Sequence, residues 1–300
     1  MLTFIESKFW LMLIIALLLG LFAPFFGKTL NPYVLFLLTI VLFLAYLKVD
    51  FFEIITHIKK PIFISYIIFL YLILIPALTF LIFRLINIEL AVAFLLLTSV
   101  PPGMAAPALT DFVKGNTSLS IAISVVAYII SPFTVVFLMY LFTGKILQLD
   151  LVSLFKTLAI FSFFPLIVAQ ICRKLFFKIV QKTKHLYSGF SVLLISFLVY
   201  IVVANQSAQI LAHPFAIIPY VAWLYLLFIL LHIAGYLVGF WRKKEDKVAL
   251  SVTKTYMNIA LAIVLGLSFF TPNIALILVL SEIPWSTTLG GFRHIIKYLD

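Results

Sequence analysis

The chain has 300 residues, of which 65% are hydrophobic and only 10% are charged, and its mean hydropathy is +1.26. A soluble domain cannot bury so much apolar surface, so the composition indicates a helical protein that crosses a bilayer several times. The single cysteine, Cys172, excludes a disulfide framework and a cysteine metal cluster.

Ten apolar stretches follow one another along the chain. Each is long enough to cross a hydrocarbon layer of about 30 Å, some of them with a tilt or a break. They lie at 9–26, 31–47, 61–83, 89–113, 118–143, 152–172, 187–209, 215–240, 248–270 and 274–292. The first stretch lacks a small-residue cleavage site, so we interpret it as a retained helix. The predicted fold class is an all-α polytopic membrane protein with ten transmembrane helices.

The net charge of +11 is distributed as a topology signal, not as a nucleic-acid-binding surface. If the N-terminus is cytoplasmic, sixteen of the 21 Lys and Arg residues fall in the segments on the cytoplasmic side. The positive-inside rule then predicts that both termini are cytoplasmic. No transit peptide or sorting signal is visible, so the expected location is a plasma (inner) membrane.

The fourth stretch contains an interruption in TSVPPGMAAPALTDFVKG, residues 98–115. Pro101 and Pro102 have no amide proton and Gly103 is conformationally free, so a regular helix cannot continue through them. Backbone groups that are freed inside a bilayer are tolerated only where protein buries them or where they line a cavity. Broken helices at the midplane form the binding sites of many secondary transporters, so this segment is the first candidate site.

Five stretches precede the loop near residue 147 and five follow it, so the second half enters the membrane from the opposite side. We therefore predict two inverted repeats, residues 1–147 and 148–300, in which the fourth and ninth stretches correspond.

The positions of the fourth and ninth stretches support this correspondence. Pro101 lies 12 residues after Glu89, and Asn258 lies 11 residues after Lys247. At about 1.5 Å per residue, both positions are 16–18 Å into the membrane from opposite faces, so they should meet near its centre. The ninth helix is also expected to be discontinuous, although no proline or glycine interrupts it at Asn258.

These two stretches resemble those of the bile acid:sodium symporter family. In PPGMAAPALTDFVKGNTSLSIAISVVAYIISP, the corresponding residues are Pro102, Gly103, Gly115, Asn116, Ser131 and Pro132. In ALSVTKTYMNIALAIVLGLSF, they are Asn258, Leu261 and Ala262. The resemblance implies a panel domain of helices 1, 2, 6 and 7, a core domain of helices 3–5 and 8–10, and a crossing of helices 4 and 9.

The same resemblance indicates that the sodium ligands of that family are missing. Its Ser-Asn pair reads Ala106-Pro107 here, and its fifth-helix hydroxyl positions read Ser124, Val125 and Ala127. The Glu and Gln of its Glu-x-x-x-Gln-Asn run read Thr253 and Met257. We therefore expect no bound sodium or other metal.

Lys254 stands beside the lost carboxylate, about 10 Å inside the ninth stretch. We hypothesise that its ammonium replaces the sodium ion or neutralises an anionic substrate, because an ionisable residue at this depth is costly. The alternative is a lysine that extends its ammonium to the interface.

Glu282 lies well inside the last stretch, where LSEIPW resembles the Glu-x-Pro feature of the arsenite-efflux carriers. Those carriers use a cysteine in the fourth helix, but the residue after the proline pair here is Gly103, so thiolate–arsenic chemistry is not expected. We interpret Glu282 either as a protonated carboxyl bound to a backbone carbonyl, or as a salt-bridge or proton-relay partner of Lys254.

The candidate cavity combines the break in the fourth stretch with polar residues of the ninth and tenth. Its members are Pro101, Pro102, Gly103, Met104, Pro107, Thr253, Lys254, Thr255, Met257, Asn258 and Glu282. The alternative for each polar residue is a hydrogen bond that packs one helix on another.

These patterns favour a secondary transporter that moves a small organic anion by alternating access. It would be independent of sodium, with protons as a candidate coupling ion, and the positive ends of the half-helices would face the anion. An uncoupled facilitator of the same fold and an arsenite-type carrier are the alternatives. An intramembrane enzyme would need paired carboxylates, H-E-x-x-H or G-x-S-x-G, and none occurs, so we expect neither catalysis nor a cofactor.

Overall fold

The computed structural model describes residues 9–48, 61–103, 105–147, 150–212, 215 and 217–298. Over these residues the secondary structure is helical, and a single isolated β-bridge joins Pro102 to Met257. The helices of the first half are α2 (Phe9–Phe22), α3 (Gly27–Leu30), α4 (Val34–Tyr46), α6 (Pro61–Phe69), α7 (Ile75–Phe83), α8 (Ile88–Ser99), α9 (Ala106–Phe112) and α10 (Thr117–Leu147). Those of the second half are α11 (Leu151–Leu175), α12 (Phe177–Ala212), α13 (Ile217–Val238), α14 (Lys244–Thr255), α15 (Ile259–Phe269), α16 (Pro272–Leu280) and α17 (Glu282–Ile295).

Each predicted apolar stretch coincides with one helix or with a pair of helices. Within the described residues, six helical segments are long and apolar enough to cross a membrane, and shorter apolar helices lie at Asn31–Tyr46, Ile88–Ser99 and Ile259–Phe269. The all-α polytopic fold class is therefore confirmed. The division into two inverted repeats and into a panel and a core stays a prediction.

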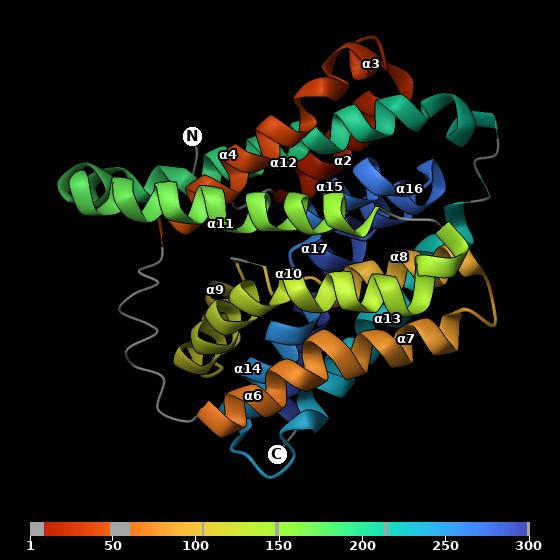
Figure 1. The fold of residues 1–300 in the computed structure, drawn as a ribbon. Helices are drawn as coiled ribbons and strands as arrows, with labels where there is room; N and C mark the ends of the chain where they lie inside the picture. Colours follow the sequence, from red (N-terminus) through yellow and green to blue (C-terminus); the bar gives the residue numbers. More distant parts are fainter. Residues whose placement is uncertain are drawn as a thin grey trace.

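The helices form two groups in space. Figure 1 shows α2, α3, α4, α11 and α12 along the upper side of the view, with α6 to α10, α13 and α14 along the lower side. Helix α12 packs on α2 and α4, and α13 packs on α14 and α17. Helix α15 contacts α4 and α11 as well as α8 and α16, so it lies where the two groups meet.

The fourth and ninth stretches are each divided into two half-helices. Helix α8 ends at Ser99 and α9 begins at Ala106, and α14 ends at Thr255 while α15 begins at Ile259. The predicted discontinuity of both stretches is therefore confirmed. The apolar core surrounds these four ends, and several of its fully buried residues belong to α8, α14 and α15.

Asn116 holds the start of α10 against α14. Its side chain accepts a hydrogen bond from Leu119 N at 3.1 Å, as expected of a residue that caps a helix, and its Nδ2 donates to Asp246 at 2.7 Å. The preceding Gly115 lies close to α14, since a Cβ atom there would be 3.0 Å from Val248 and 3.1 Å from Ala249 N. The Gly-Asn pair thus allows the half-helix α9 to turn back into α10.

Candidate functional site

The extended segments between the half-helices pair with each other. Gly103 N donates to Tyr256 O at 2.7 Å, and Asn258 N donates to Pro101 O at 2.8 Å. These bonds flank the antiparallel bridge between Pro102 and Met257. Backbone groups that leave a helix in an apolar interior must find other partners, and here each break supplies partners for the other.

Local residue chemistry explains where each break lies. In the first, the prolines at positions 101 and 102 remove the donors that would continue α8. In the second, the Asn258 side chain accepts from Leu261 N at 3.1 Å and so caps the start of α15. Its Nδ2 also donates to the Tyr128 hydroxyl at 3.1 Å, which fixes the cap to α10.

Gly103 is required by the close approach of the two extended segments. A Cβ atom at this position would lie 3.1 Å from Met257 O and 3.2 Å from Tyr256 O, both of them backbone atoms. We expect Gly103→Ala to destabilise the protein by about 1–3 kcal/mol, because the crossing must separate to admit the methyl group. Thermal unfolding in detergent measures this effect. Gly290→Ala is the matched control, since a Cβ atom there meets nothing within 4 Å; an equal loss in both variants would contradict the prediction.

The Lys254 ammonium is buried and is held by two backbone carbonyls. Its Nζ donates to Tyr71 O at 2.7 Å and to Thr98 O at 2.8 Å, and it lies 5.6 Å from the centre of the Tyr71 ring. The side chain is 4% exposed, so the alternative of an ammonium that reaches the interface is wrong. The bonds join α14 to α8 and to the π-helical turn η2 (Leu70–Leu74).

Proline residues explain why these two carbonyls are available. Thr98 O would receive the amide of residue 102 in a continuous α-helix, but that residue is Pro102. Around η2 the helix bonds residue i to residue i−5, as Ile75 N does to Leu70 O. The next donor in this register is Pro76, which has no amide proton, so Tyr71 O has no helical partner. The ammonium thus satisfies two carbonyls that prolines leave without a donor.

The threonines on either side of Lys254 bond within the helix bundle. Thr253 Oγ1 lies 2.6 Å from Ala249 O and 3.0 Å from Ser120 Oγ, and Thr255 Oγ1 donates to Ser251 O at 2.8 Å. Both side chains are buried. Their hydroxyls pack α14 on its own turns and on α10, which is the packing alternative given for them.

A cavity of about 250 Å³ opens beside the crossing. Residues from five helices and from the two breaks line it: Val41, Leu42, Ala45, Lys48, Gly103, Ala105, Ala108, Ser191, Ile195, Met257, Asn258, Ile259, Ala260, Glu282 and Trp285. Its polar groups are few and lie on different elements, an arrangement that is typical of small-molecule sites. The Ser191 hydroxyl is buried without a hydrogen-bond partner among the described residues.

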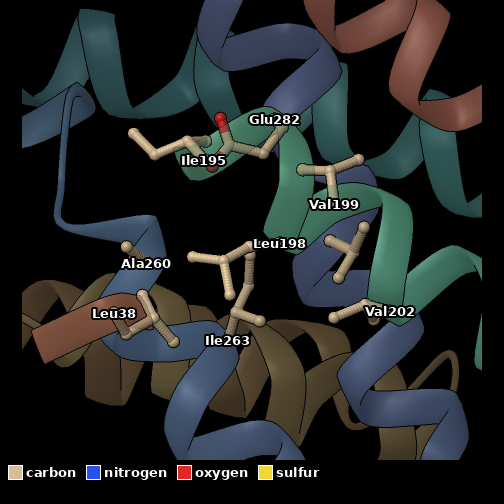
Figure 2. Close-up of a pocket in the computed structure, with 9 residues that line it drawn as sticks. Leu38, Ile195, Leu198, Val199, Val202, Ala260, Ile263 and Glu282 are labelled. Atoms are coloured by element: carbon tan, nitrogen blue, oxygen red, sulfur yellow. The ribbon is translucent and has the colours of Figure 1, made fainter. Parts of the chain in front are cut away.

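Glu282 is the carboxyl of this cavity. It is the first residue of α17 and is 7% exposed, and over the described residues no hydrogen bond or ion pair holds its carboxyl. Glu282 also lines a second cavity of about 10 Å³, room for about one water, whose remaining walls are aliphatic. Figure 2 shows Glu282 beside Ile195 and Val199, with Ala260, Leu198 and Ile263 completing the apolar surroundings.

Four of the predicted site residues line the larger cavity: Gly103, Met257, Asn258 and Glu282. Pro101, Pro102, Pro107, Thr253, Lys254 and Thr255 are not among its lining residues, and Met104 lies outside the described residues. The proposed pair of Lys254 and Glu282 is not formed, because the bonds of the ammonium go to backbone carbonyls. Nor is the Glu282 carboxyl bound to a backbone carbonyl among the described residues, so both interpretations of it need correction.

Sequence reasoning missed the wall of the cavity that α4 and α12 supply. Lys48 follows the end of α4, and Ser191 and Ile195 lie on α12. Both stretches are apolar along most of their length, so nothing local distinguishes their cavity-lining residues from lipid-facing ones. The one signal in the sequence that could have indicated this wall was Lys48. We had counted it only as one of the basic residues that indicate the cytoplasmic side.

Crossed half-helices, backbone groups paired across two breaks and a cavity beside them are the features of a secondary transporter. Comparison with known proteins agrees. The model of the sodium bile acid symporter family matches residues 35–213, and this chain belongs to that family. Over 190 residues, 61% of this chain, it is 30% identical to a Bacillus subtilis (strain 168) protein described as the uncharacterized sodium-dependent transporter YocS. The match spans 57% of the length of that relative. The chain is thus a multi-pass membrane protein of a transporter family.

Proposed function

We propose that this protein moves a small organic anion by alternating access, coupled to a proton and independent of sodium. The observation that carries the proposal is the pair of ionisable side chains buried near the crossing. One is an ammonium held by two backbone carbonyls, and the other is a carboxyl in the cavity wall that has no partner among the residues that the structure describes. Charged groups inside a membrane protein are costly, so both positions need a functional reason.

The lining of the cavity supports an anionic substrate. Lys48 contributes a positive charge at its edge, and Asn258 marks the N-terminus of α15, where amide groups and the helix dipole favour negative charge. The remaining wall is largely apolar, with Val41, Leu42 and Ile195 prominent. A small carboxylate with an aliphatic part would match this combination.

The environment of Lys254 supports independence from sodium. Carbonyl oxygens are the ligands that hard cations prefer, and here a covalently attached cation occupies two of them. The position of the family's carboxylate ligand is Thr253, whose hydroxyl bonds within the bundle.

Glu282 is the proposed site of the coupling proton. When ionised, its carboxylate would repel an anion in the same cavity, but when protonated it would donate a hydrogen bond to that anion. The proton and the anion would therefore bind together, and their binding free energies would be coupled in both directions.

Alternating access follows from the predicted domains. A panel of α2, α4, α11 and α12 and a core of the remaining helices would move against each other, and the cavity between α4, α12 and α15 would open to each side in turn. We further propose that the chain comprises inverted repeats at 1–147 and 148–300 and lies in a plasma membrane with both termini in the cytoplasm.

The melting temperature of the purified protein in sodium tests the proposal. Sodium chloride is compared with potassium and choline chloride at equal ionic strength. A cation that binds only the folded protein stabilises it by about 2.7 kcal/mol at one hundred times its Kd. We expect no difference among the three salts. A rise that is specific to sodium would contradict sodium independence.

A further inference from the structure

A chain of hydrogen-bonded polar side chains connects α13, the end of α14 and α17. His232, on α13, is 7% exposed, and its ring stacks on Phe292 with the centroids 4.1 Å apart. Its Nδ1 lies 2.9 Å from Ser251 Oγ, and its Nε2 lies 3.3 Å from the Tyr256 hydroxyl. The Tyr256 hydroxyl in turn lies 3.1 Å from Thr288 Oγ1 on α17.

Each ring nitrogen of His232 has one hydrogen-bond partner. Nδ1 is paired with Ser251 Oγ and Nε2 with the Tyr256 hydroxyl, and the tautomer of the ring decides which atom of each pair donates. The neighbouring hydroxyls also bond to carbonyls: Ser251 Oγ donates to His232 O at 2.8 Å, and Thr288 Oγ1 donates to Pro284 O at 2.7 Å. The ring thus connects α13 to α14 through both of its nitrogens.

Tyr256 connects this chain to the crossing. It is the C-cap residue that directly follows α14, and its carbonyl accepts the amide of Gly103, one of the two bonds that join the breaks. Its ring also packs edge-on against Trp285, which lines the cavity, with the centroids 5.5 Å apart. Whatever orients the Tyr256 side chain therefore orients both the crossing and one wall of the cavity.

We propose that His232 is a positioning residue of the transport site, and that it acts through the hydrogen bond between its Nε2 and the Tyr256 hydroxyl. Because the ring is on α13, this bond fixes the crossing to a helix outside the two broken ones. Loss of this hydrogen bond would let Tyr256, together with the extended segment that follows α14, move away from Gly103. The inference concerns the same site as the proposed function, but its test needs no substrate, so either can fail without the other.

The test measures how accessible the cavity wall becomes. A reporter thiol is introduced by Ala260→Cys in a Cys172→Ser background, since Ala260 is half-buried in that wall. We expect His232→Leu and Tyr256→Phe each to raise its rate of reaction with N-ethylmaleimide by about fivefold, the factor that corresponds to one net hydrogen bond. The double variant should show no further rise, because both changes remove the same bond.

Two conservative variants identify which nitrogen matters. His232→Gln places a terminal amide, which can accept or donate a hydrogen bond, near the position of Nε2 and should retain a rate close to that of the parent protein. His232→Asn reaches only the position of Nδ1 and should react as fast as His232→Leu. If His232→Asn kept the parent rate and His232→Gln reacted as fast as His232→Leu, the contact with Ser251 would be the important one. That result would overturn the proposal.

A stability control separates positioning from general loosening. Phe228 is fully buried one turn earlier on α13, so Phe228→Leu should lower the melting temperature without changing the thiol reaction rate. If Phe228→Leu raises the rate as much as His232→Leu does, the effect is general destabilisation and the proposal is wrong. An unchanged rate in His232→Leu would also overturn it.

Discussion

Lys254→Met is expected to lower the melting temperature of the protein strongly, by about 5–10 °C. The substitution preserves much of the side-chain volume but removes the donor from Tyr71 O and Thr98 O, which prolines have deprived of helical partners. Each buried carbonyl left without a donor costs about 1–3 kcal/mol. Thermal unfolding in detergent at neutral pH measures the loss.

The same variant tests whether the ammonium occupies a cation site. We expect sodium or methylammonium to raise the melting temperature of Lys254→Met, and to have no effect on the unsubstituted protein. Lys244→Met is the control, because it makes the same change at the other end of α14, where the lysine side chain has no hydrogen bond within the described part of the chain. A loss of stability that no small cation restores would leave Lys254 as a structural donor and remove the support for sodium replacement. An unchanged melting temperature would contradict both roles.

Glu282→Gln is expected to abolish the pH dependence of anion binding. In the unsubstituted protein, affinity should fall by up to tenfold per pH unit as the pH rises above the pKa of this carboxyl, since only the protonated form accepts the anion. A glutamine is permanently neutral and keeps a donor, so the variant should bind with one affinity at every pH. The measurement is the increase in melting temperature that acetate, lactate or succinate causes, recorded from pH 5 to pH 8. This increase reports the affinity for the anion at each pH.

Transport by the same variant distinguishes a coupled carrier from a facilitator. In proteoliposomes with an imposed pH gradient, Glu282→Gln should equilibrate the bound carboxylate without accumulating it, whereas the parent protein accumulates it. Glu89→Gln is the matched control, because that carboxylate accepts from Thr271 at 2.8 Å and from Asn273 at 3.1 Å, far along α8 from the cavity. A parent protein that never accumulates the anion would favour the uncoupled facilitator.

Chain composition and local residue chemistry were sufficient for the outline of this fold. The apolar stretches predicted the helices because any segment in a bilayer must satisfy its own backbone groups. The break at Pro101 and Pro102 was equally predictable, since a residue without an amide proton interrupts a helix in any surroundings. The carbonyl of Thr98, which lacks a helical donor, can also be predicted from the position of Pro102. That of Tyr71 cannot, because the π-helical register that pairs it with Pro76 is visible only in the structure.

Contacts between residues far apart in the sequence decided the partners of Lys254, the position of the second break and the lining of the cavity. Lys254 meets carbonyls 183 and 156 positions away, and neither this separation nor the absence of a bond to Glu282 is encoded near the lysine. No proline or glycine near Asn258 indicates that the ninth stretch is interrupted there. The half-helix begins at this position because Pro101 O, in the other break, accepts the amide of Asn258. Thus the sequence alone determined the break at Pro101 and Pro102 and the loss of a helical donor to Thr98 O, because these depend on a proline and its neighbours along the chain. The tertiary structure decided the second break, the donor that satisfies Thr98 O and Tyr71 O, and the side chains that line the cavity.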